Sequence, residues 1–359
     1  MSAATYIAIY YYFLLAFTIV VCLMNVKSCE RYRGILTFVL LSFVFVHIGF
    51  RPLDPLFGDT RTYAREFNEM CQYHSFEARK DFFFYYISLL ISRITQSTTV
   101  YFCILGLSYI LPVLFALKKR LPQTYFLVLF AYVCSFSFWG YGVNGLRNGL
   151  GVSFFLLALL SDKKIIQLLF IAVSIAFHTS LALPVIALFI AKYLHGNPKT
   201  YNVLWLICLL ASLIAGHSIG DYLGSISFIN GIDERMSGYL TLSTDDMSDI
   251  TFNQQGFRWD FVLYSSIPII VGGYYIYNKK YEDSIYKLLY CIYLLCNAFW
   301  LLTIYVPFNN RFAYLSWFLH PILLTYPLVT SEHVVRNRNS ILHWTLFLNY
   351  LFTFIMWLR

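Results

Sequence analysis

Three polar positions in an otherwise apolar sequence carry side chains that could do chemistry. Arg147 lies in a stretch rich in glycine and asparagine at residues 140–149, His178 is followed by threonine and serine, and Arg311 follows two asparagines. An arginine presents a rigid fork of N–H donors that binds an oxyanion in a bidentate way, which a lysine cannot do. A histidine accepts a proton when neutral and can bind phosphate when charged. These side chains predict chemistry at a phosphate group.

The surroundings of Arg147 allow two interpretations. If residues 144–151 are helical, one face carries Asn144, Arg147, Asn148 and Gly151. That face has three polar side chains and a gap where another group could approach, which predicts a ligand or a partner. Alternatively, Gly145 and Gly149 form a small-residue packing contact and Arg147 extends to the lipid headgroups. An arginine near membrane depth is functional by default, which favours the first interpretation.

His178 and Arg311 also have structural interpretations. A lone histidine is more often a satisfied structural residue than a catalytic one. Arg311 could be an interfacial anchor, with Pro307 restricting the chain that approaches it.

The long polar loops hold a candidate base. Residues 58–63 read Gly-Asp-Thr-Arg-Thr-Tyr, and Asp81 directly precedes an apolar stretch. A carboxylate near the membrane surface, among arginines, could deprotonate a hydroxyl, although surface loops routinely hold such residues. Residues 218–260 carry seven acids against two arginines, a net charge of −5, and we interpret most of these acids as solvated.

The composition identifies an integral membrane protein. The chain has 359 residues, of which 59% are hydrophobic and only 12% charged, a balance that a soluble domain of this size would not tolerate. The net charge of +8 is divided between two sides, which argues against nucleic-acid binding.

The eight cysteines lie mostly in apolar runs and form no disulfide pattern. The apolar start from Ala3 lacks the features of a cleaved signal, so we expect it to stay as an anchor.

The distribution of basic residues predicts the topology. Ten of the eleven lysines fall in short loops on one side, and ten of the fifteen arginines fall on the other. Because basic residues are retained in cytoplasmic loops, the lysine-rich side is predicted to be cytoplasmic, and the arginines on the opposite side require another reason. The cytoplasmic clusters are Lys27/Arg31/Arg33, Lys118/Lys119/Arg120, Lys163/Lys164, Lys192/Lys199, Lys279/Lys280/Lys287 and Arg336/Arg338.

Each segment between these clusters must cross the membrane an even number of times. Residues 121–161 and 165–191 are therefore predicted to go out and return, with outer turns at 140–148 and 178–180. The legs of the second hairpin are shorter than the ~20 residues of a full span, which predicts tilted, broken or re-entrant helices. Residues 82–94 are too short to span and are interpreted as an interfacial or re-entrant helix on the outer side. The remaining predicted spans are 6–26, 34–50, 99–117, 202–217, 261–277, 288–306, 313–329 and 341–358.

This path gives an all-α polytopic membrane protein with about twelve transmembrane or re-entrant helices and both termini outside. Two longer outer loops follow, at residues 51–81 and 218–260, and neither is large enough to be an independent domain. We therefore predict a single transmembrane domain over residues 1–359.

Several nucleotide and metal motifs are missing from the sequence. It contains no Walker loop, no dinucleotide fingerprint, no paired spacing typical of a zinc site and no nucleophilic serine elbow. We therefore expect no cofactor and no metal. A reaction that needs neither must use a substrate that is already activated, and lipid-linked pyrophosphate is such a substrate.

The series of motifs resembles the EpsG-like branch of the Wzy polysaccharide polymerases, which extend O-antigen and exopolysaccharide chains. The matching pieces, in order along most of the chain, are Gly58-Asp59 with Tyr63, Leu146-Arg147, Phe177-His178-Thr179-Ser180, Arg235 with Tyr239, and Arg311 with Tyr314. The family often has Glu-Pro before the interfacial helix, where this chain has Lys80-Asp81 without proline. That departure argues against a role for Asp81.

The resemblance implies a GT-C-like helical bundle that acts as a multi-pass glycosyltransferase in the bacterial inner membrane, with its active site facing the periplasm. It implies an undecaprenyl-pyrophosphate-linked glycan as donor and a lipid-linked repeat unit as acceptor, in lipopolysaccharide or exopolysaccharide synthesis. Besides this glycan and membrane lipids, a chain-length regulator and a flippase are candidate partners, and nucleic acid is not.

Site roles follow from the same resemblance. We hypothesise an inverting, metal-free transfer in which arginines neutralise the charge on the departing pyrophosphate. The pyrophosphate-binding residues would be Arg147, Arg311 and Arg235. Asp59 is the candidate base and His178 its rival, and other substrate contacts would come from Asn144, Asn148, Tyr63 and Tyr239.

Two other classes of function remain open. A lipid-linked oligosaccharide flippase or transporter would need ionisable groups in the middle of spans and pseudo-symmetric halves, whereas the charges here lie at span ends. A membrane O-acyltransferase would use a histidine, and His178 is compatible with it.

Overall fold

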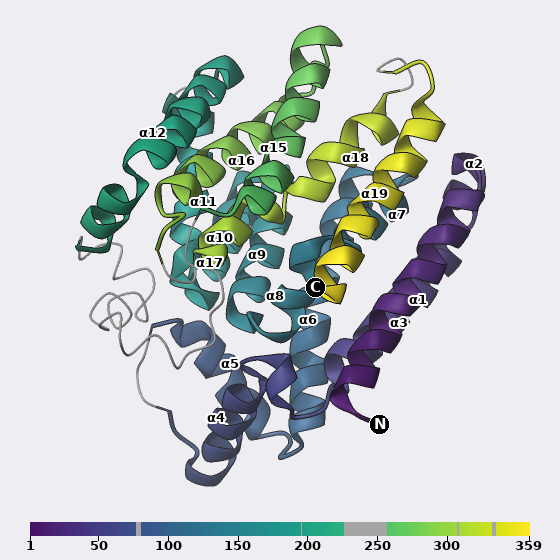
Figure 1. Cartoon of the computed structure of the whole chain (residues 1–359). Helices are drawn as coiled ribbons and strands as arrows, with labels where there is room; N and C mark the ends of the chain where they lie inside the picture. The colour runs from purple at the N-terminus through teal and green to yellow at the C-terminus, as the bar shows by residue number, and fades with distance from the viewer. Residues whose placement is uncertain (77–79, 195, 226–256, 307–308, 332–334) are drawn as a thin grey trace. The chain divides into compact units, whose positions relative to one another are not determined.

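The computed structural model describes residues 1–76, 80–194, 196–225, 257–306, 309–331 and 335–359. Every regular element within these ranges is a helix (Figure 1). The chain divides into two compact units, unit 1 (Met1–Leu181 and Leu324–Arg359) and unit 2 (Ala182–Leu323). That the whole chain is a single domain stays a prediction.

Unit 1 holds the N-terminal helices and the last helix of the chain. Its elements are α1 (Ala3–Leu23), α2 (Val26–Arg31), α3 (Arg33–Gly49), η1 (Pro55–Phe57), α4 (Thr60–Tyr73), α5 (Phe82–Ser92), α6 (Thr98–Arg120), α7 (Tyr125–Val133), α8 (Phe136–Val143), α9 (Leu146–Leu159), α10 (Lys164–Phe177), η2 (Thr179–Leu181) and α19 (Arg338–Leu358). The first helix of this unit, α1, packs against both α3 and α19 (Figure 1).

Unit 2 holds the helices between these two parts. Its elements are α11 (Ala182–Phe189), η3 (Ile190–Leu194), α12 (Pro198–Ser225), α15 (Trp259–Gly273), η4 (Tyr274–Asn278), α16 (Ser284–Leu302) and α17 (Asn310–Trp317). The helix α18 (His320–Thr330) contains the boundary with the C-terminal part of unit 1.

Six helical stretches in the described ranges are long and apolar enough to cross a membrane. They are α1, α6, Pro198–Ile219, α16, Asn310–Thr330 and α19. A seventh is added if α7 and α8, which are bent by 70° at their junction, form one broken span. Shorter apolar stretches are α3, α5, α9, α10 and Thr179–Leu194. The protein is thus a polytopic membrane protein that is all-helical over its described residues, while the total of about twelve crossings and the GT-C-like arrangement stay predictions.

Helix boundaries follow local chemistry. Side-chain oxygens of Ser2, Ser97 and Asp283 accept backbone N–H bonds at the starts of α1, α6 and α16, at 3.2, 3.4 and 2.8 Å. Each satisfies a donor that a helix N-terminus leaves without a partner. The predicted interruption at residues 178–180 is confirmed, because α10 ends at Phe177 and His178 has extended backbone. Since α11 belongs to unit 2, the return of the chain after this break stays a prediction. The predicted turn at 140–148 contains the junction of α8 and α9, and a further break at residues 134–135 was not predicted.

Close packing fixes α9 within unit 1, where it contacts α6 and α10. The Ser174 hydroxyl of α10 donates a hydrogen bond of 2.8 Å to the carbonyl of Gly151. A Cβ atom on Gly151 would lie 3.0 Å from the Ser174 carbonyl oxygen, closer than most Cβ contacts, so glycine favours this close approach of the two helices. The gap that the sequence predicted at Gly151 is therefore occupied by α10.

The predicted polar face on residues 144–151 forms only in part. Asn144 lies outside α9, as the C-cap residue that follows α8, because α9 begins at Leu146. Its side chain and carbonyl contact the first outer loop instead. The expectation that Asn144 shares a helical face with Arg147 is therefore wrong for this structure.

Basic residues and the predicted site residues lie at opposite ends of the α9–α10 pair. Lys119, near the end of α6, forms an ion pair of 3.0 Å with Asp162, which lies between α9 and α10. Arg147 and His178 lie at the other end, where α9 begins and α10 stops. This arrangement agrees with the predicted separation of lysines from arginines.

Candidate active site

A buried carboxylate joins three segments of unit 1. Asp81, the residue before α5, is only 5% exposed. Its Oδ2 atom lies 2.8 Å from His178 Nδ1 and 3.3 Å from Arg147 Nη1. Its Oδ1 atom accepts the backbone N–H of Thr179 at 2.9 Å. A single carboxylate thus connects the start of α5, the start of α9 and the break after α10.

The backbone of Asp81 is unusual. Its φ of 62° lies in the left-handed region, which costs a residue other than glycine about 1–2 kcal/mol. Such a conformation persists where surrounding contacts determine it, and it is frequent at functional sites. Here the three donors to the carboxylate supply those contacts.

Arg147 is held between two aromatic rings. Its guanidinium carbon lies 5.9 Å from the ring centroids of both Tyr63 and Tyr85. Arg147 Nη1 also donates a hydrogen bond of 3.3 Å to the Tyr85 hydroxyl. These contacts orient the guanidinium, and they place Tyr63 and Arg147 close together. That either residue binds substrate stays a prediction.

The break at His178 orients its imidazole. If Nδ1 carries the proton, it donates to the ionised Asp81, and Nε2 is then the acceptor nitrogen. The side chains of His178 and Arg147 are 25% and 24% exposed, against 4% for Asp81. The imidazole and the guanidinium are therefore partly exposed, while the carboxylate is covered.

The charges of the cluster keep Asp81 ionised. Burial alone would raise the pKa of Asp81, but the hydrogen bonds from His178 and Thr179, together with the charges of His178 and Arg147, outweigh it and lower the pKa below 3.8. The carboxylate is therefore negative at neutral pH.

The first outer loop is fastened to the same site through Asn144. The backbone N–H of Asp59 donates to Asn144 Oδ1 at 2.9 Å, and the Tyr63 hydroxyl donates to the Asn144 carbonyl at 3.1 Å. Gly58 has a φ of 57°, and a Cβ atom there would lie 2.2 Å from Asn144 Oδ1. Only glycine fits this approach. Asp59 thus meets Asn144 through its backbone, and its side chain does not cap α4.

Arg51 is a buried residue of this region that the sequence analysis did not select. Its Nε atom donates to the Thr60 hydroxyl at 2.9 Å, and its guanidinium lies 3.9 Å from the centroid of the Phe102 ring. Burial lowers the pKa of Arg51 to about 10, so the side chain stays charged at neutral pH. Arg51 holds the first residue of α4, the helix that carries Tyr63. The signal available in the sequence was an arginine directly after a predicted span.

The remaining predicted site residues have different positions. Asn148 is buried, and its Oδ1 atom has no hydrogen-bond partner among the described residues. Arg311 is the second residue of α17, in unit 2. Arg235 and Tyr239 lie outside the described residues.

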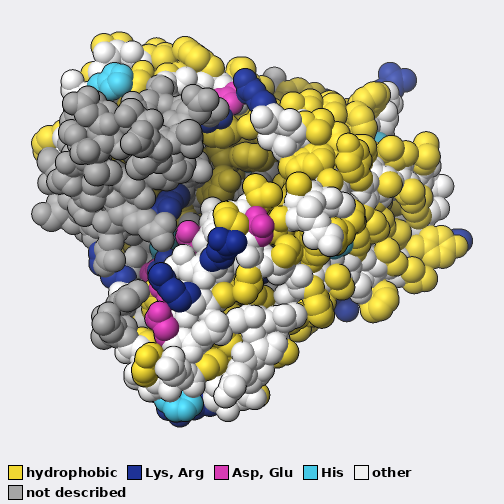
Figure 2. All heavy atoms as spheres, turned by 60° about the horizontal axis from the view of Figure 1, so that its bottom comes forward, with side chains coloured by type: hydrophobic (Ala, Val, Ile, Leu, Met, Phe, Trp, Pro, Cys, Tyr) yellow, Lys and Arg dark blue, Asp and Glu magenta, His cyan; other side chains and the backbone are white. Residues whose placement is uncertain are grey.

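Charged side chains of both signs gather on the face that carries α4 and α5. Figure 2 turns the bottom of Figure 1 toward the viewer and shows basic and acidic side chains close together there, beside hydrophobic surface. Within the described ranges, no three His, Cys, Asp or Glu side chains are grouped so that they could hold a metal ion. That the reaction needs no metal stays a prediction.

Comparison with known protein families decides the family. The sequence model of the EpsG family matches residues 34–359, which include all the helices from α5 to α19 and every residue of the Asp81 cluster. The chain belongs to the EpsG family. The resemblance to EpsG-like polysaccharide polymerases is thereby confirmed. No curated protein and no solved structure matches this EpsG-family chain.

The Asp81 carboxylate predicts a pH-dependent contribution to stability. Because its pKa lies below 3.8, the contribution is fully present above that value and is lost as the pH falls through the lower value of the folded protein. We expect Asp81→Asn to lower the free energy of unfolding by about 1–3 kcal/mol at pH 6 and by less at pH 3. Denaturant unfolding in detergent at both pH values measures the difference.

Asp162→Asn is the matched control, because Asp162 forms an exposed ion pair with Lys119. This variant should unfold with nearly the free energy of wild type at both pH values, because an exposed ion pair contributes little to stability. A destabilisation by Asp81→Asn of equal size at the two pH values would contradict the assignment.

Proposed function

We propose that this protein is an inverting glycosyltransferase that extends a polysaccharide at the outer face of a bacterial inner membrane. The donor is an undecaprenyl-pyrophosphate-linked glycan, and the acceptor is a lipid-linked repeat unit. Membership of the EpsG family supports polysaccharide polymerisation in a membrane. The observation that supports the chemistry is the cluster of Asp81, His178 and Arg147, in which a base and an anion-binding group lie side by side.

His178 is the proposed general base. Its Nε2 atom takes the proton of the acceptor hydroxyl as that oxygen forms a bond to the anomeric carbon of the donor. Asp81 positions the imidazole and stabilises the imidazolium that results. Of the two candidate bases in the sequence, the geometry favours His178 over Asp59, because His178 has an oriented ring and a carboxylate partner.

Arg147 is the proposed partner of the leaving group. As the bond between the anomeric carbon and the pyrophosphate oxygen breaks, the bonding electrons pass to the pyrophosphate, which leaves with its lipid. The contacts of Arg147 with Asp81 and Tyr85 both use its Nη1 atom. A guanidinium carries five N–H donors in all, and we propose that N–H groups on the other nitrogens bind the pyrophosphate. Arg311 and Arg235 are proposed as further pyrophosphate ligands.

Sugar contacts complete the proposed site. Asn148, next to Arg147, carries a buried acceptor without a partner among the described residues. Tyr63, Asn144 and Tyr239 are the other proposed substrate contacts. A chain-length regulator and a flippase are proposed partners, and the reaction is proposed to proceed without metal.

The products distinguish polymerisation from the two other classes of function. Purified protein incubated with a lipid-linked repeat unit should produce species heavier by whole repeat units, detected by mass spectrometry. A mass increment of an acyl group would indicate an acyltransferase instead. Unchanged glycan that moves between leaflets of a vesicle would indicate a flippase.

Arg147→Lys should keep the positive charge but lose the planar fork that binds two phosphate oxygens. We expect a loss of polymerisation rate of at least about 100-fold, which corresponds to about 2.7 kcal/mol of transition-state stabilisation, with normal insertion in the membrane. Polymer length on a gel and the rate with purified protein measure the effect. The control is Arg65→Lys, at an exposed ion pair on α4, which should polymerise normally. Wild-type polymer from Arg147→Lys would refute the assignment.

His178→Asn should remove the proposed base. We expect a loss of kcat of about 100- to 10,000-fold, because general-base catalysis contributes about that much. Asp81→Asn should lose less, and the double variant should be no slower than His178→Asn, since the two side chains act as a unit. Single-turnover kinetics of the three variants measure this coupling. Independent, multiplicative losses would show that Asp81 does not act through His178.

A further inference from the structure

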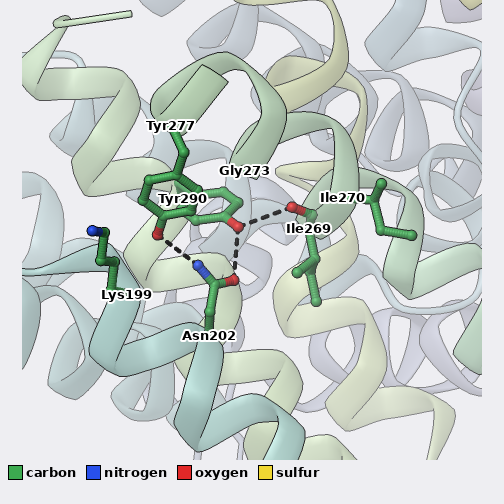
Figure 3. A pocket seen from close by; sticks show the side chains of 7 residues that line it. All are labelled: Lys199, Asn202, Ile269, Ile270, Gly273, Tyr277 and Tyr290. Carbon is green, nitrogen blue, oxygen red and sulfur yellow. Dashed lines mark hydrogen bonds between the residues drawn. The ribbon is translucent and has the colours of Figure 1, made fainter. Parts of the chain in front are cut away.

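Unit 2 contains a cavity of about 430 Å³ that the proposed reaction does not use. It lies between the start of α12, the end of α15 with η4, and the start of α16. Lys199, Asn202, Tyr277 and Tyr290 provide its polar lining (Figure 3). The rest of the lining is apolar.

The polar side of the cavity is organised around one amide. Asn202 Nδ2 donates to the Tyr277 hydroxyl at 2.7 Å, and Asn202 Oδ1 lies 2.8 Å from the Tyr290 hydroxyl. Tyr290 is fully buried and also lies 2.9 Å from the carbonyl oxygen of Ile269. These bonds connect α12, α15, η4 and α16, so the cavity is formed before any ligand arrives.

Two donors remain for a ligand. The Tyr277 oxygen accepts the Asn202 N–H, which leaves the hydroxyl proton of Tyr277 to be donated elsewhere. The ammonium of Lys199 lies 5.9 Å from the centroid of the Tyr277 ring. In Figure 3 the Lys199 ammonium and the Tyr277 hydroxyl lie on the same side of Asn202. A hydroxyl donor beside a cation suits an anionic oxygen.

The apolar lining continues along a surface of the same helix. Ile270, which lines the cavity, is 69% exposed, and Leu263 and Ile267 on α15 are also exposed. The neighbouring stretch Pro198–Ile219 is apolar enough to span a membrane, and Val203, Leu206 and Ile207 on it are exposed. A ligand here would place its charged part at Lys199 and its apolar part against these side chains. A free phosphate has no such apolar part.

The basic residues around the cavity indicate which leaflet it faces. Lys199 lies in the first turn of α12, and Lys279 and Lys280 directly follow η4. Lysines and tyrosines at span ends are typical of the membrane–water interface, and lysine-rich ends are retained in the cytoplasm. Basic pockets between helices on that side suit anionic lipid headgroups.

We propose that this cavity binds the phosphodiester headgroup of an anionic phospholipid from the cytoplasmic leaflet, with Lys199 and Tyr277 as ligands of the phosphate. One acyl chain lies along the exposed face of α15 at Ile270. The site shares no residue with the Asp81 cluster and does not depend on the proposed glycosyl transfer.

Native mass spectrometry of the full-length protein in detergent tests the proposal. Phosphatidylglycerol and phosphatidylcholine with the same acyl chains are titrated separately, and the Kd of the first bound lipid is measured. We expect phosphatidylglycerol to bind more tightly, and Lys199→Gln and Tyr277→Phe each to weaken it about fivefold without changing phosphatidylcholine binding. Equal binding of the two lipids by wild type would overturn the proposal.

Lys192→Gln is the matched control. Lys192 is an exposed lysine whose ammonium lies 5.5 Å from the centroid of the Tyr193 ring, and it does not line the cavity. This variant should bind phosphatidylglycerol as wild type does, and an equal loss in it would show that only overall charge matters. If Lys199→Gln does not fold, Tyr277→Phe alone decides, and unchanged binding by it would refute the site.

Competition identifies the source of the anion. Inorganic phosphate at millimolar concentration and undecaprenyl phosphate are each added to the phosphatidylglycerol complex. We expect neither compound to displace phosphatidylglycerol, with undecaprenyl phosphate added at a concentration equal to that of the phospholipid. Displacement by inorganic phosphate would overturn the proposal and identify free phosphate as the ligand. Undecaprenyl phosphate would be the ligand instead if it bound more tightly than phosphatidylglycerol and if Lys199→Gln abolished that binding.

Discussion

The candidate site depends on the need to satisfy one buried carboxylate. A carboxylate removed from water is costly unless charges and hydrogen bonds compensate it. Asp81 obtains this compensation from three donors on two other segments, His178, Arg147 and the backbone of Thr179. Several local features agree with this requirement. The backbone of Asp81 turns to positive φ, α10 stops so that Thr179 N–H is available, and α9 begins just before Arg147.

Close packing at two glycines helps to place the segments that carry the hydrogen-bond donors near the Asp81 carboxylate. Gly151 lets α10 approach α9 until the Ser174 hydroxyl bonds the Gly151 carbonyl. Gly58 lets the first outer loop close on Asn144, three residues before Arg147. A Cβ atom at Gly58 would collide with the Asn144 side chain, and one at Gly151 would crowd the Ser174 carbonyl oxygen. The geometry of the polar cluster is therefore set by positions that have no side chain.

The sequence predicted those features of the site that depend on residues close together in the chain. His178 interrupts an apolar run, and a polar residue in such a run predicts a break in the helix, which the structure contains. Arg147 is conspicuous because an arginine at this depth is costly. The contact of Asn144 with Asp59 could not be predicted in the same way, because it joins residues 85 positions apart through a backbone N–H.

The position of Asp81 was not predicted by the local sequence pattern. The missing Glu-Pro pattern argued against it, yet its carboxylate lies at the centre of the cluster. Neither its left-handed backbone nor the Thr179 N–H that it accepts has a signal in the sequence. The burial of Arg51 is similar, because the residues that cover it, Thr60 and Phe102, come from separate helices. Tertiary contacts, which periodicity does not record, decide both positions.

In the proposed mechanism, one oxygen atom couples the two halves of the reaction. Asp81 Oδ2 contacts both His178 Nδ1 and Arg147 Nη1. When the imidazole accepts a proton it becomes a cation, and its attraction to this oxygen increases. When the donor bond breaks, the pyrophosphate gains negative charge and attracts the guanidinium. Both changes favour a shift of the Arg147 guanidinium from Asp81 toward the pyrophosphate. The Asp81 carboxylate then interacts mainly with the imidazolium of His178. Proton transfer and departure of the leaving group then support each other, because each strengthens the interaction that the other requires.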